Sequence, residues 1–425
     1  MTRACLLALA GCATTSVPLV PPGTPPLGDP ADVAMDALVA GDFAAVTRAF
    51  DPASAPPTPV RVAQVWHARS AGLGIARSWR PGDRTFQDGL EIRTAFVELS
   101  RGELECLLSI DEGSHRLASL FVTRPAPPAR YADASRFHAI ALELGEPPFV
   151  LPATLLVPAG DGPFPAAVLV HGSGPNDRDE TVAANKPFRD IAEGLASAGI
   201  AVLRYDKRTF AYGDQLTNDI TVEDEVIADA VAAVHVLAAR PEVDRARVVV
   251  IGHSLGGMLA PDIARRAGGV AGLALLAPPG REPWEILRDQ MRYLHAPKAT
   301  RVELERAIVG IETGLRADIP IMGMPASYWI ELASHDGVAA ARALARPVLV
   351  LHGSRDYQVT DADFAIWKTG LAAMRGAELV TLPGDNHLLI TGRGPPTPME
   401  YKVPGHVDPR AIERLVTFVR HLPRA

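Results

Sequence analysis

The chain has 425 residues, of which 48% are hydrophobic and 21% charged, and its formal net charge is -7. This composition predicts a folded protein, and the length exceeds one ordinary core, so we expect two domains plus accessory segments. The acidic balance, without any block of like charges, excludes nucleic acid as an expected partner. No run of about eighteen apolar residues is present, so the sequence predicts no transmembrane helix.

The N-terminus resembles a bacterial lipobox signal. Residues 1–12 contain one early positive charge, a short apolar run and the closing letters LAGC. In that pattern cleavage leaves Cys12 as the first mature residue, and its sulfur carries a lipid; an ordinary secretory signal or a mis-chosen start codon is the alternative. Residues 13–30 are rich in Pro, Thr and Gly, which predicts a semi-rigid tether. We therefore expect the cell envelope as the location, with the protein a lipoprotein or a secreted or periplasmic protein, and membrane contact only through this anchor.

Residues 31–124 are predicted to form a small α+β domain. Apolar residues first recur at helical spacing and then alternate with polar ones, with turn-forming residues between the alternating runs. The proline-rich segment 125–130 predicts a domain boundary. We expect helices at 32–40, 42–50 and 60–75, followed by an antiparallel meander of strands at 90–99, 103–110 and 115–122.

Residues 137–421 are predicted to form a larger α/β domain with a mostly parallel, doubly wound sheet. Short, nearly continuous apolar runs alternate with helical patterns, as in sheets that are buried on both faces. The helical interval at about 280–335 interrupts the alternation and predicts a cap inserted over the active site. The expected strands are 136–144, 152–158, 166–170, 201–205, 248–251, 273–276, 348–351 and 378–382, and the expected helices are 188–198, 222–240, 255–267, 363–374 and 409–421.

The most informative segment is 248–257, which reads VVVIGHSLGG. A buried strand is followed by G-x-S-x-G and then by a helix, which is the context of a nucleophilic serine on a sharp strand-to-helix turn. Small residues are needed on both sides of Ser254 because that turn strains the backbone. A serine that merely caps the helix is the alternative.

A serine nucleophile requires a histidine base and an orienting acid, which follow such a turn in the order acid, then histidine. Asp356 lies on the loop after the strand 348–351, and His387 lies on the loop after the strand 378–382. We therefore predict a triad of Ser254, Asp356 and His387. The alternatives considered are Asp361, Asp363 and Asp385 as the acid and His171, His253 and His352 as the base.

The strand 166–170 runs into the loop 171–175, HGSGP, which predicts the second donor of an oxyanion hole. The backbone N–H groups of Ser173 and Leu255 are the candidate donors. A phosphate-binding loop is the competing interpretation, but no GxxxxGK[ST] follows. The charged run 204–208 is interpreted as a structural network near the site, with substrate contact as the alternative. No cysteine or histidine spacing indicates a metal site, and no cofactor is expected.

These segments together resemble a known family. The residues that carry the resemblance lie in 171–175, 205–208, 252–257, 353–359, 386–387, 397–401 and 404–407. They are similar to the α/β-hydrolase superfamily, specifically to bacterial extracytoplasmic esterases related to the serine-aminopeptidase-like hydrolases. Residues 31–124 resemble the NTF2-like domain of unknown function that is often fused to such esterases. The resemblance implies an α/β-hydrolase fold, the triad Ser254, Asp356 and His387, and hydrolysis of short acyl esters.

The function expected from this sequence is that of a carboxylic-ester hydrolase acting on a small-molecule ester through an acyl-enzyme. A serine aminopeptidase acting on short peptides is the alternative, since the triad sets the reaction class and the pocket sets the substrate. A tethered, non-enzymatic envelope binding protein is a third possibility, which an intact triad disfavours. The acyl length, the alcohol portion and the oligomeric state do not follow from the sequence.

Overall fold

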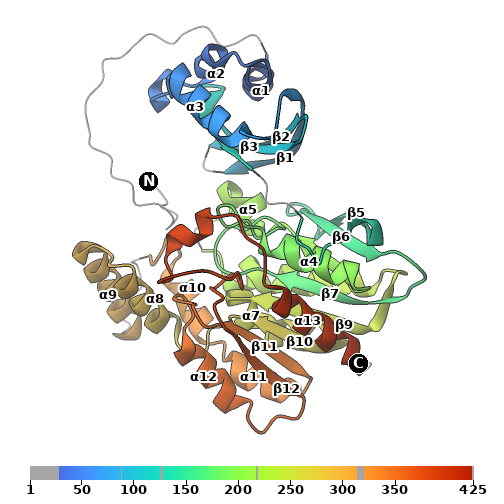
Figure 1. Cartoon of the computed structure of the whole chain (residues 1–425). Coiled ribbons are helices and arrows are strands. Elements are labelled where there is room, and N and C mark those ends of the chain that lie inside the picture. The colour runs from blue at the N-terminus through green and yellow to red at the C-terminus, as the bar shows by residue number, and fades with distance from the viewer. Residues whose placement is uncertain (1–27, 88, 125–127, 217–218, 314–319, 424–425) are drawn as a thin grey trace. The chain divides into compact units, whose positions relative to one another are not determined.

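The computed structural model describes residues 28–87, 89–124, 128–216, 219–313 and 320–423. The chain divides into two compact units near residue 128, and each is described by itself (Figure 1). The lipobox with Cys12 and nearly all of the expected tether lie outside the described residues. Among the described residues, no helix combines the length and apolar character needed to cross a bilayer.

Three helices and a four-stranded antiparallel sheet form the N-terminal unit. The sheet has the order β1-β2-β3-β4. Alternate side chains of β3, including Leu104, Cys106 and Leu108, are fully buried and pack in one cluster with the helices, so one face of the sheet carries the core. The elements are α1 (Pro30–Ala40), α2 (Phe43–Ala49), α3 (Pro59–Ser70), β1 (Ala76–Gln87), β2 (Leu90–Leu99), β3 (Gly102–Asp111) and β4 (Arg116–Thr123).

One prediction for this unit was wrong, and one strand was missed. The tether prediction included residue 30, but Pro30 is the first residue of α1, and Asp29 caps that helix by accepting from the Ala31 N–H (2.9 Å). Strand β1 was not predicted at all. It contains Pro81 and Gly82, which are disfavoured in strands, and it forms an edge strand whose register slips between Pro81 and Arg84. The identification of this unit as an NTF2-like domain remains a prediction.

The larger unit is built on an eight-stranded sheet with the order β12-β11-β10-β9-β7-β8-β6-β5. The pairs from β12 through to β8 are parallel, whereas β6 pairs antiparallel with β8 and β5 with β6. This confirms the expected mostly parallel sheet. The strands are β5 (Phe137–Leu144), β6 (Leu151–Pro158), β7 (Phe164–Val170), β8 (Ala201–Tyr205), β9 (Val243–His253), β10 (Val270–Leu276), β11 (Val348–Gly353) and β12 (Ala377–Leu382).

Helices cover both faces of this sheet (Figure 1). Helices α4 and α13 bury their apolar stripes in one cluster with alternate residues of the central strands, such as Val249 and Ile251 of β9. Helices α6 and α7 also contact β9 but contribute nothing to that cluster, which places them on the opposite face. The helices are α4 (Pro187–Ser197), α5 (Arg208–Ala211), α6 (Ala228–Ala238, preceded by a π-helical turn at Glu223–Ile227), α7 (Leu255–Ala267), α12 (Asp361–Gly370) and α13 (Pro409–His421).

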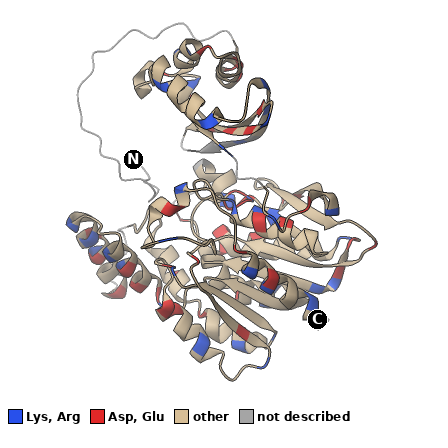
Figure 2. Ribbon diagram, viewed as in Figure 1, with Lys and Arg blue, Asp and Glu red and all other residues tan. Residues whose placement is uncertain are grey.

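Four further helices lie between β10 and β11, where the sequence predicts a cap: α8 (Pro283–Tyr293), α9 (Lys298–Thr313), α10 (Ala326–Ala333) and α11 (Gly337–Leu344). Helices α8, α9 and α10 contribute to a small apolar cluster of their own that includes Met291 and Ile308. Figure 2 shows charges of both signs interspersed along these helices, and Arg288 of α8 pairs with Glu305 of α9 (2.9 Å). This pair is partly exposed, so it adds little to stability.

The carboxyl ends of five parallel strands meet at one edge of the sheet. Val170 at the end of β7 is in register with Gly252 of β9, and His253 is in register with Leu276 of β10. Gly353 ends β11 opposite the last residue of β12. The loops that follow these strands therefore start side by side, and they are the loops in which the sequence places its candidate catalytic residues.

Candidate active site

Ser254 occupies the sharp turn between β9 and α7. Its backbone has φ 51° and ψ −119°, a conformation that a residue with a side chain rarely adopts and that surrounding contacts must sustain. The Ser254 N–H donates to the Leu276 carbonyl (2.8 Å), and its own carbonyl accepts the first helical bond from Met258 (3.0 Å). The strained serine thus stands at the N-terminus of a helix, as the G-x-S-x-G context predicts.

The glycines on either side of Ser254 are required by close backbone approach. A Cβ atom added to Gly252 would lie 2.2 Å from the carbonyl oxygen of Gly256. A Cβ added to Gly256 would lie 2.3 Å from the carbonyl oxygen of Val170. Neither distance is sterically possible, so the turn can only form with glycine at both positions.

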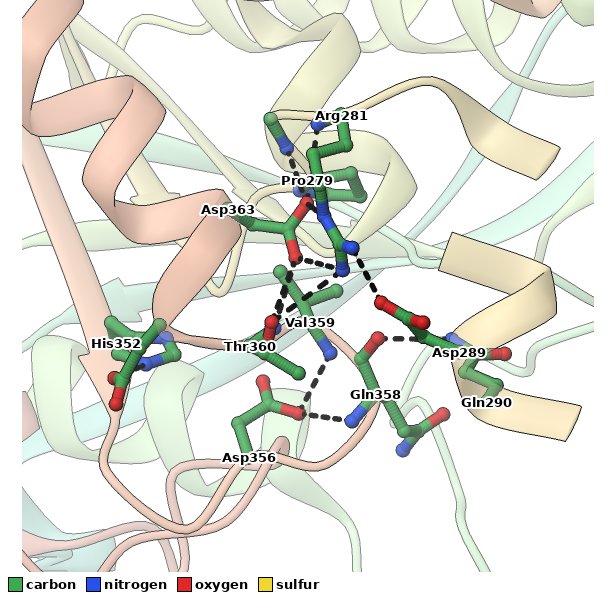
Figure 3. Close-up of polar contacts among 12 residues, drawn as sticks. Pro279, Arg281, Asp289, Gln290, His352, Asp356, Gln358, Val359, Thr360 and Asp363 are labelled. Atoms are coloured by element: carbon green, nitrogen blue, oxygen red, sulfur yellow. Dashed lines mark hydrogen bonds and ion pairs between the residues drawn. The ribbon is translucent and has the colours of Figure 1, made fainter. Parts of the chain in front are cut away.

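The Asp356 carboxylate is buried and fully engaged on the loop after β11. Its Oδ2 accepts from His387 Nδ1 at 2.6 Å, and its Oδ1 accepts from the backbone N–H groups of Gln358 (2.8 Å) and Val359 (3.0 Å). Figure 3 shows the two backbone bonds. Both oxygens of this carboxylate are therefore held in place, one by the backbone of its own loop and one by His387.

His387 follows β12 and is 5% exposed. Asn386 shapes its loop by accepting from the N–H groups of Leu388 (3.0 Å) and Ile390 (3.2 Å). The imidazole ring lies 4.7 Å from the ring of His253, which directly precedes Ser254. Within the described part of the chain, the hydrogen bonds of His387 do not include one from the Ser254 hydroxyl, so the structure gives the aspartate–histidine half of a relay.

The other acids considered from the sequence have different partners. Asp361 is largely exposed and pairs with His352 (2.9 Å). Asp363 forms a capping box with Thr360 at the start of α12. Asp385 accepts from the Thr391 hydroxyl (2.8 Å). Of these carboxylates, the structure brings Asp356 to His387 Nδ1.

The other histidines considered also have structural surroundings. His352 is buried, and its ring stacks on Phe364 at 5.0 Å. His171 Nε2 lies 3.0 Å from the Asp177 carbonyl, and burial lowers the pKa of His171 to about 4. His253 Nε2 lies 2.9 Å from the His387 carbonyl. His253 therefore contacts the backbone of the candidate base rather than taking its place.

The loop 171–175 is held rigidly beside Ser254. The Gly172 N–H donates to Glu180 Oε1 (2.7 Å), and the Gly172 carbonyl accepts from Lys207 Nζ (2.9 Å). A Cβ on Gly172 would lie 3.2 Å from Ser254 Cβ, so the loop and the serine are in direct contact. Among the hydrogen bonds of the described residues, none uses the N–H of Ser173 or Leu255, the two donors considered from the sequence.

The charged run 204–208 is confirmed as a structural network. Lys207 is 2% exposed and links the Gly172 carbonyl of the loop 171–175 to Glu225. Glu225 also accepts from the Tyr328 hydroxyl. The pairs are Arg204 with Asp179, Asp206 with Arg178 (2.8 Å), Lys207 with Glu225 (2.6 Å) and Arg208 with Asp229 (2.6 Å). Each charge is matched inside the fold, so the run braces the loop beside Gly172.

A second network joins the cap helices to the loop after β11, which carries Asp356 (Figure 3). Arg281 precedes α8 and donates to the buried Asp363 carboxylate (2.9 Å) and to Asp289 of α8. Gln290 of α8 donates to the carbonyl of Gln358 (3.1 Å), whose N–H binds Asp356. The cap helices therefore help to hold the loop that carries Asp356 in place. The sequence analysis missed this network because no local pattern pairs Arg281 with Asp363, a residue in the first turn of a helix about eighty positions later.

Asp385 and Asp408 share one hydroxyl group. Thr391 Oγ1 lies 2.8 Å from an oxygen of each carboxyl group, but a hydroxyl carries one proton, so the second contact needs a proton on a carboxyl group. Burial and the nearby Asp408 raise the pKa of Asp385 to about 7. Asp408, which Arg410 holds, keeps its pKa low, at about 2. Asp385 is therefore the protonated partner in acidic solution.

This arrangement predicts a stability cost at alkaline pH that Asp385→Asn removes. The folded-state pKa of Asp385 is raised above its ordinary value of 3.8, so its contribution to stability is present below about pH 4 and is lost as the pH rises through 7. We expect wild type and variant to be equally stable at pH 4 and the variant to be more stable by about 2 kcal/mol at pH 8. Urea unfolding at both pH values measures this difference, and a wild-type advantage at pH 8 would contradict it.

A mostly parallel sheet with a strained serine between strand and helix, and an aspartate–histidine pair on later loops of the same edge, is the architecture of α/β-type hydrolases. Residues 167–394, which are more than half of the chain, match the model of the alpha/beta hydrolase family, and the chain belongs to this family.

Individual relatives agree with this assignment. Esterase EstD from Thermotoga maritima is 38% identical over 366 residues, which cover 84% of this chain and 86% of that protein. The chain also aligns at low identity with two solved structures. An esterase from Pyrococcus furiosus aligns with a TM-score of 0.45 and 16% identity, over 67% of this chain and 91% of that protein. Est1E from Butyrivibrio proteoclasticus aligns with a TM-score of 0.44 and 18% identity, over 66% of this chain and 96% of that protein.

Proposed function

We propose that this protein is a carboxylic-ester hydrolase that uses Ser254 as nucleophile, His387 as general base and Asp356 as the orienting acid. The observation that carries the proposal is the strained Ser254 backbone (φ 51°) at the sheet edge where His387 Nδ1 and Asp356 bind at 2.6 Å. The similarity to an esterase over most of both chains supports an ester as the substrate.

In the acylation step the Ser254 hydroxyl oxygen attacks the ester carbonyl while His387 Nε2 takes its proton. The proton on Nδ1 stays in the bond to Asp356, which selects the tautomer with a free Nε2 and stabilises the imidazolium as it forms. His387 then returns the proton to the leaving alcohol. Water attacks the resulting acyl-serine by the same route and releases the acid, so neither step needs a metal ion or an organic cofactor.

The negative oxygen of the tetrahedral intermediate is proposed to bind the N–H groups of Ser173 and Leu255. Both belong to segments next to the nucleophile, and Leu255 is the first residue of α7, whose N-terminus favours negative charge. Losing one such donor typically costs on the order of 3 kcal/mol of transition-state stabilisation. Lys207 and Asn176 support the Ser173 side because both donate to the Gly172 carbonyl (2.9 and 3.1 Å).

The substrate class is tested by comparing two series with one enzyme preparation. We expect p-nitrophenyl esters of short acyl chains to be hydrolysed with higher kcat/KM than aminoacyl p-nitroanilides, and a fluorophosphonate probe to label Ser254. Faster turnover of the anilides would instead identify a peptidase. Absence of both activities, together with absence of labelling at Ser254, would refute the hydrolase assignment.

A further inference from the structure

Behind the proposed triad lies a second acid–histidine pair, formed by Glu180 and His253. The two side chains are 2% and 6% exposed. Glu180 Oε2 lies 3.0 Å from His253 Nδ1, as an ion pair whose angles do not suit a hydrogen bond. The pair touches both sides of the site, because Glu180 Oε1 accepts from the Gly172 N–H (2.7 Å) and His253 Nε2 lies 2.9 Å from the His387 carbonyl.

The neighbours of the His253 ring determine its protons. The His387 carbonyl can only accept, so Nε2 must carry a proton. A bare Nδ1 lone pair 3.0 Å from the Glu180 carboxylate would be repelled, so Nδ1 needs a proton as well unless Glu180 itself carries one. The Gly172 N–H bond favours the ionised form of Glu180. Both ring nitrogens are then protonated.

The electrostatics of the surroundings agree with a charged pair. Burial opposes both charges, but the attraction to Glu180 outweighs it and raises the pKa of His253 above its usual value. Burial is likewise outweighed at Glu180, where His253, His171 and the Gly172 N–H lower the pKa of the carboxyl group. Asp356 also favours the His253 cation, and the Lys207 cation, which binds the Gly172 carbonyl, is neutralised by Glu225.

We propose that Glu180 and His253 are positioning residues that form a buried carboxylate–imidazolium pair, fixing the His387 loop and the Gly172 loop and placing a positive charge beside the base. The positive charge lies beside the base because the centroids of the His253 and His387 rings are 4.7 Å apart. A neighbouring cation opposes protonation of His387, while Asp356 favours it. Removing the His253 charge should therefore change the pH dependence of catalysis. This inference rests on the proposed function only for its kinetic consequences.

Glu180→Gln tests the charge with little change in shape. A glutamine can still accept from the Gly172 N–H, and its uncharged amide group faces His253 Nδ1 without favouring a proton there, which leaves His253 neutral with its proton on Nε2. We expect the acidic limb of the kcat/KM profile with a p-nitrophenyl ester to move up by about one pH unit. An acidic limb identical to that of wild type would overturn the proposal.

Two further variants separate position from charge. His253→Phe removes the donor to the His387 carbonyl, and we expect kcat to fall by about tenfold with little change in KM. Asp262→Asn is the matched control. Asp262 lies in the second half of α7, and the variant neutralises a carboxylate that pairs with a different histidine, His335 (2.9 Å). We expect that variant to keep the wild-type pH profile, and a shift equal to that of Glu180→Gln would count against the proposal.

The protonation state can be measured without any activity. Protein labelled with ¹⁵N-histidine should show both nitrogens of His253 protonated at pH 8 in wild type, with the signal assigned by its loss in His253→Phe. A singly protonated His253 in wild type would overturn the charged pair even if the variants unfold. An inactive wild type that shows the imidazolium would refute the ester hydrolase while leaving the pair in place.

Discussion

Ser254→Ala is expected to lower kcat for p-nitrophenyl ester hydrolysis by about 10⁶-fold and to abolish labelling by a fluorophosphonate probe. The variant removes the oxygen that attacks the ester carbonyl, and no neighbouring group replaces it. The backbone contacts of the turn, from the Ser254 N–H to the Leu276 carbonyl and from Met258 to the Ser254 carbonyl, do not use the hydroxyl group. Alanine should therefore preserve the fold while removing the chemistry.

The control for this variant is Ser135→Ala, which removes an exposed hydroxyl that binds only the nearby Asp133. We expect full activity and labelling from it. Thermal unfolding of both variants should match that of wild type. Retained labelling in Ser254→Ala would show that another residue is the nucleophile and would overturn the assignment of the triad.

Asp356→Asn is expected to lower kcat by about 10⁴-fold with a much smaller change in KM. The reason lies in the orientation of the side chain. The backbone N–H groups of Gln358 and Val359 both donate to Oδ1, so this position must remain an oxygen in asparagine. The amide nitrogen then faces His387 Nδ1 and donates to it, which moves the ring proton to Nε2, where it blocks acceptance of the serine proton.

Asp361→Asn is the matched control because the sequence alone offered Asp361 as a competing acid. Its carboxylate is largely exposed and pairs with the buried His352. We expect near-wild-type kcat and KM for this variant. Loss of activity in Asp361→Asn, with activity retained in Asp356→Asn, would show that the acid had been misassigned.

Much of the larger unit could be predicted because its elements have strong local signals. The predicted helices 255–267 and 409–421 coincide with α7 and α13, whose apolar stripes recur at helical spacing. The buried parallel strands are continuous apolar runs and lie where they were expected. Strand β1 could not be found in this way, because Pro81 and Gly82 interrupt any alternation and the segment depends on tertiary contacts, including its pairing with β2.

Residue types and their order along the chain were enough to choose Ser254, since a strand, two glycines and a helix must surround a strained nucleophile wherever it occurs. Chain order and loop position also selected Asp356 as the partner of His387, but they could not show that Glu180 reaches His253 or that Arg281 reaches Asp363. Those contacts join loops that are separated by tens of residues, and a side chain's partner there depends on how the sheet brings strand ends together. Local patterns thus specify the strands, helices and nucleophile, whereas only the folded sheet edge determines the charge and hydrogen-bond partners that would tune the catalytic histidine.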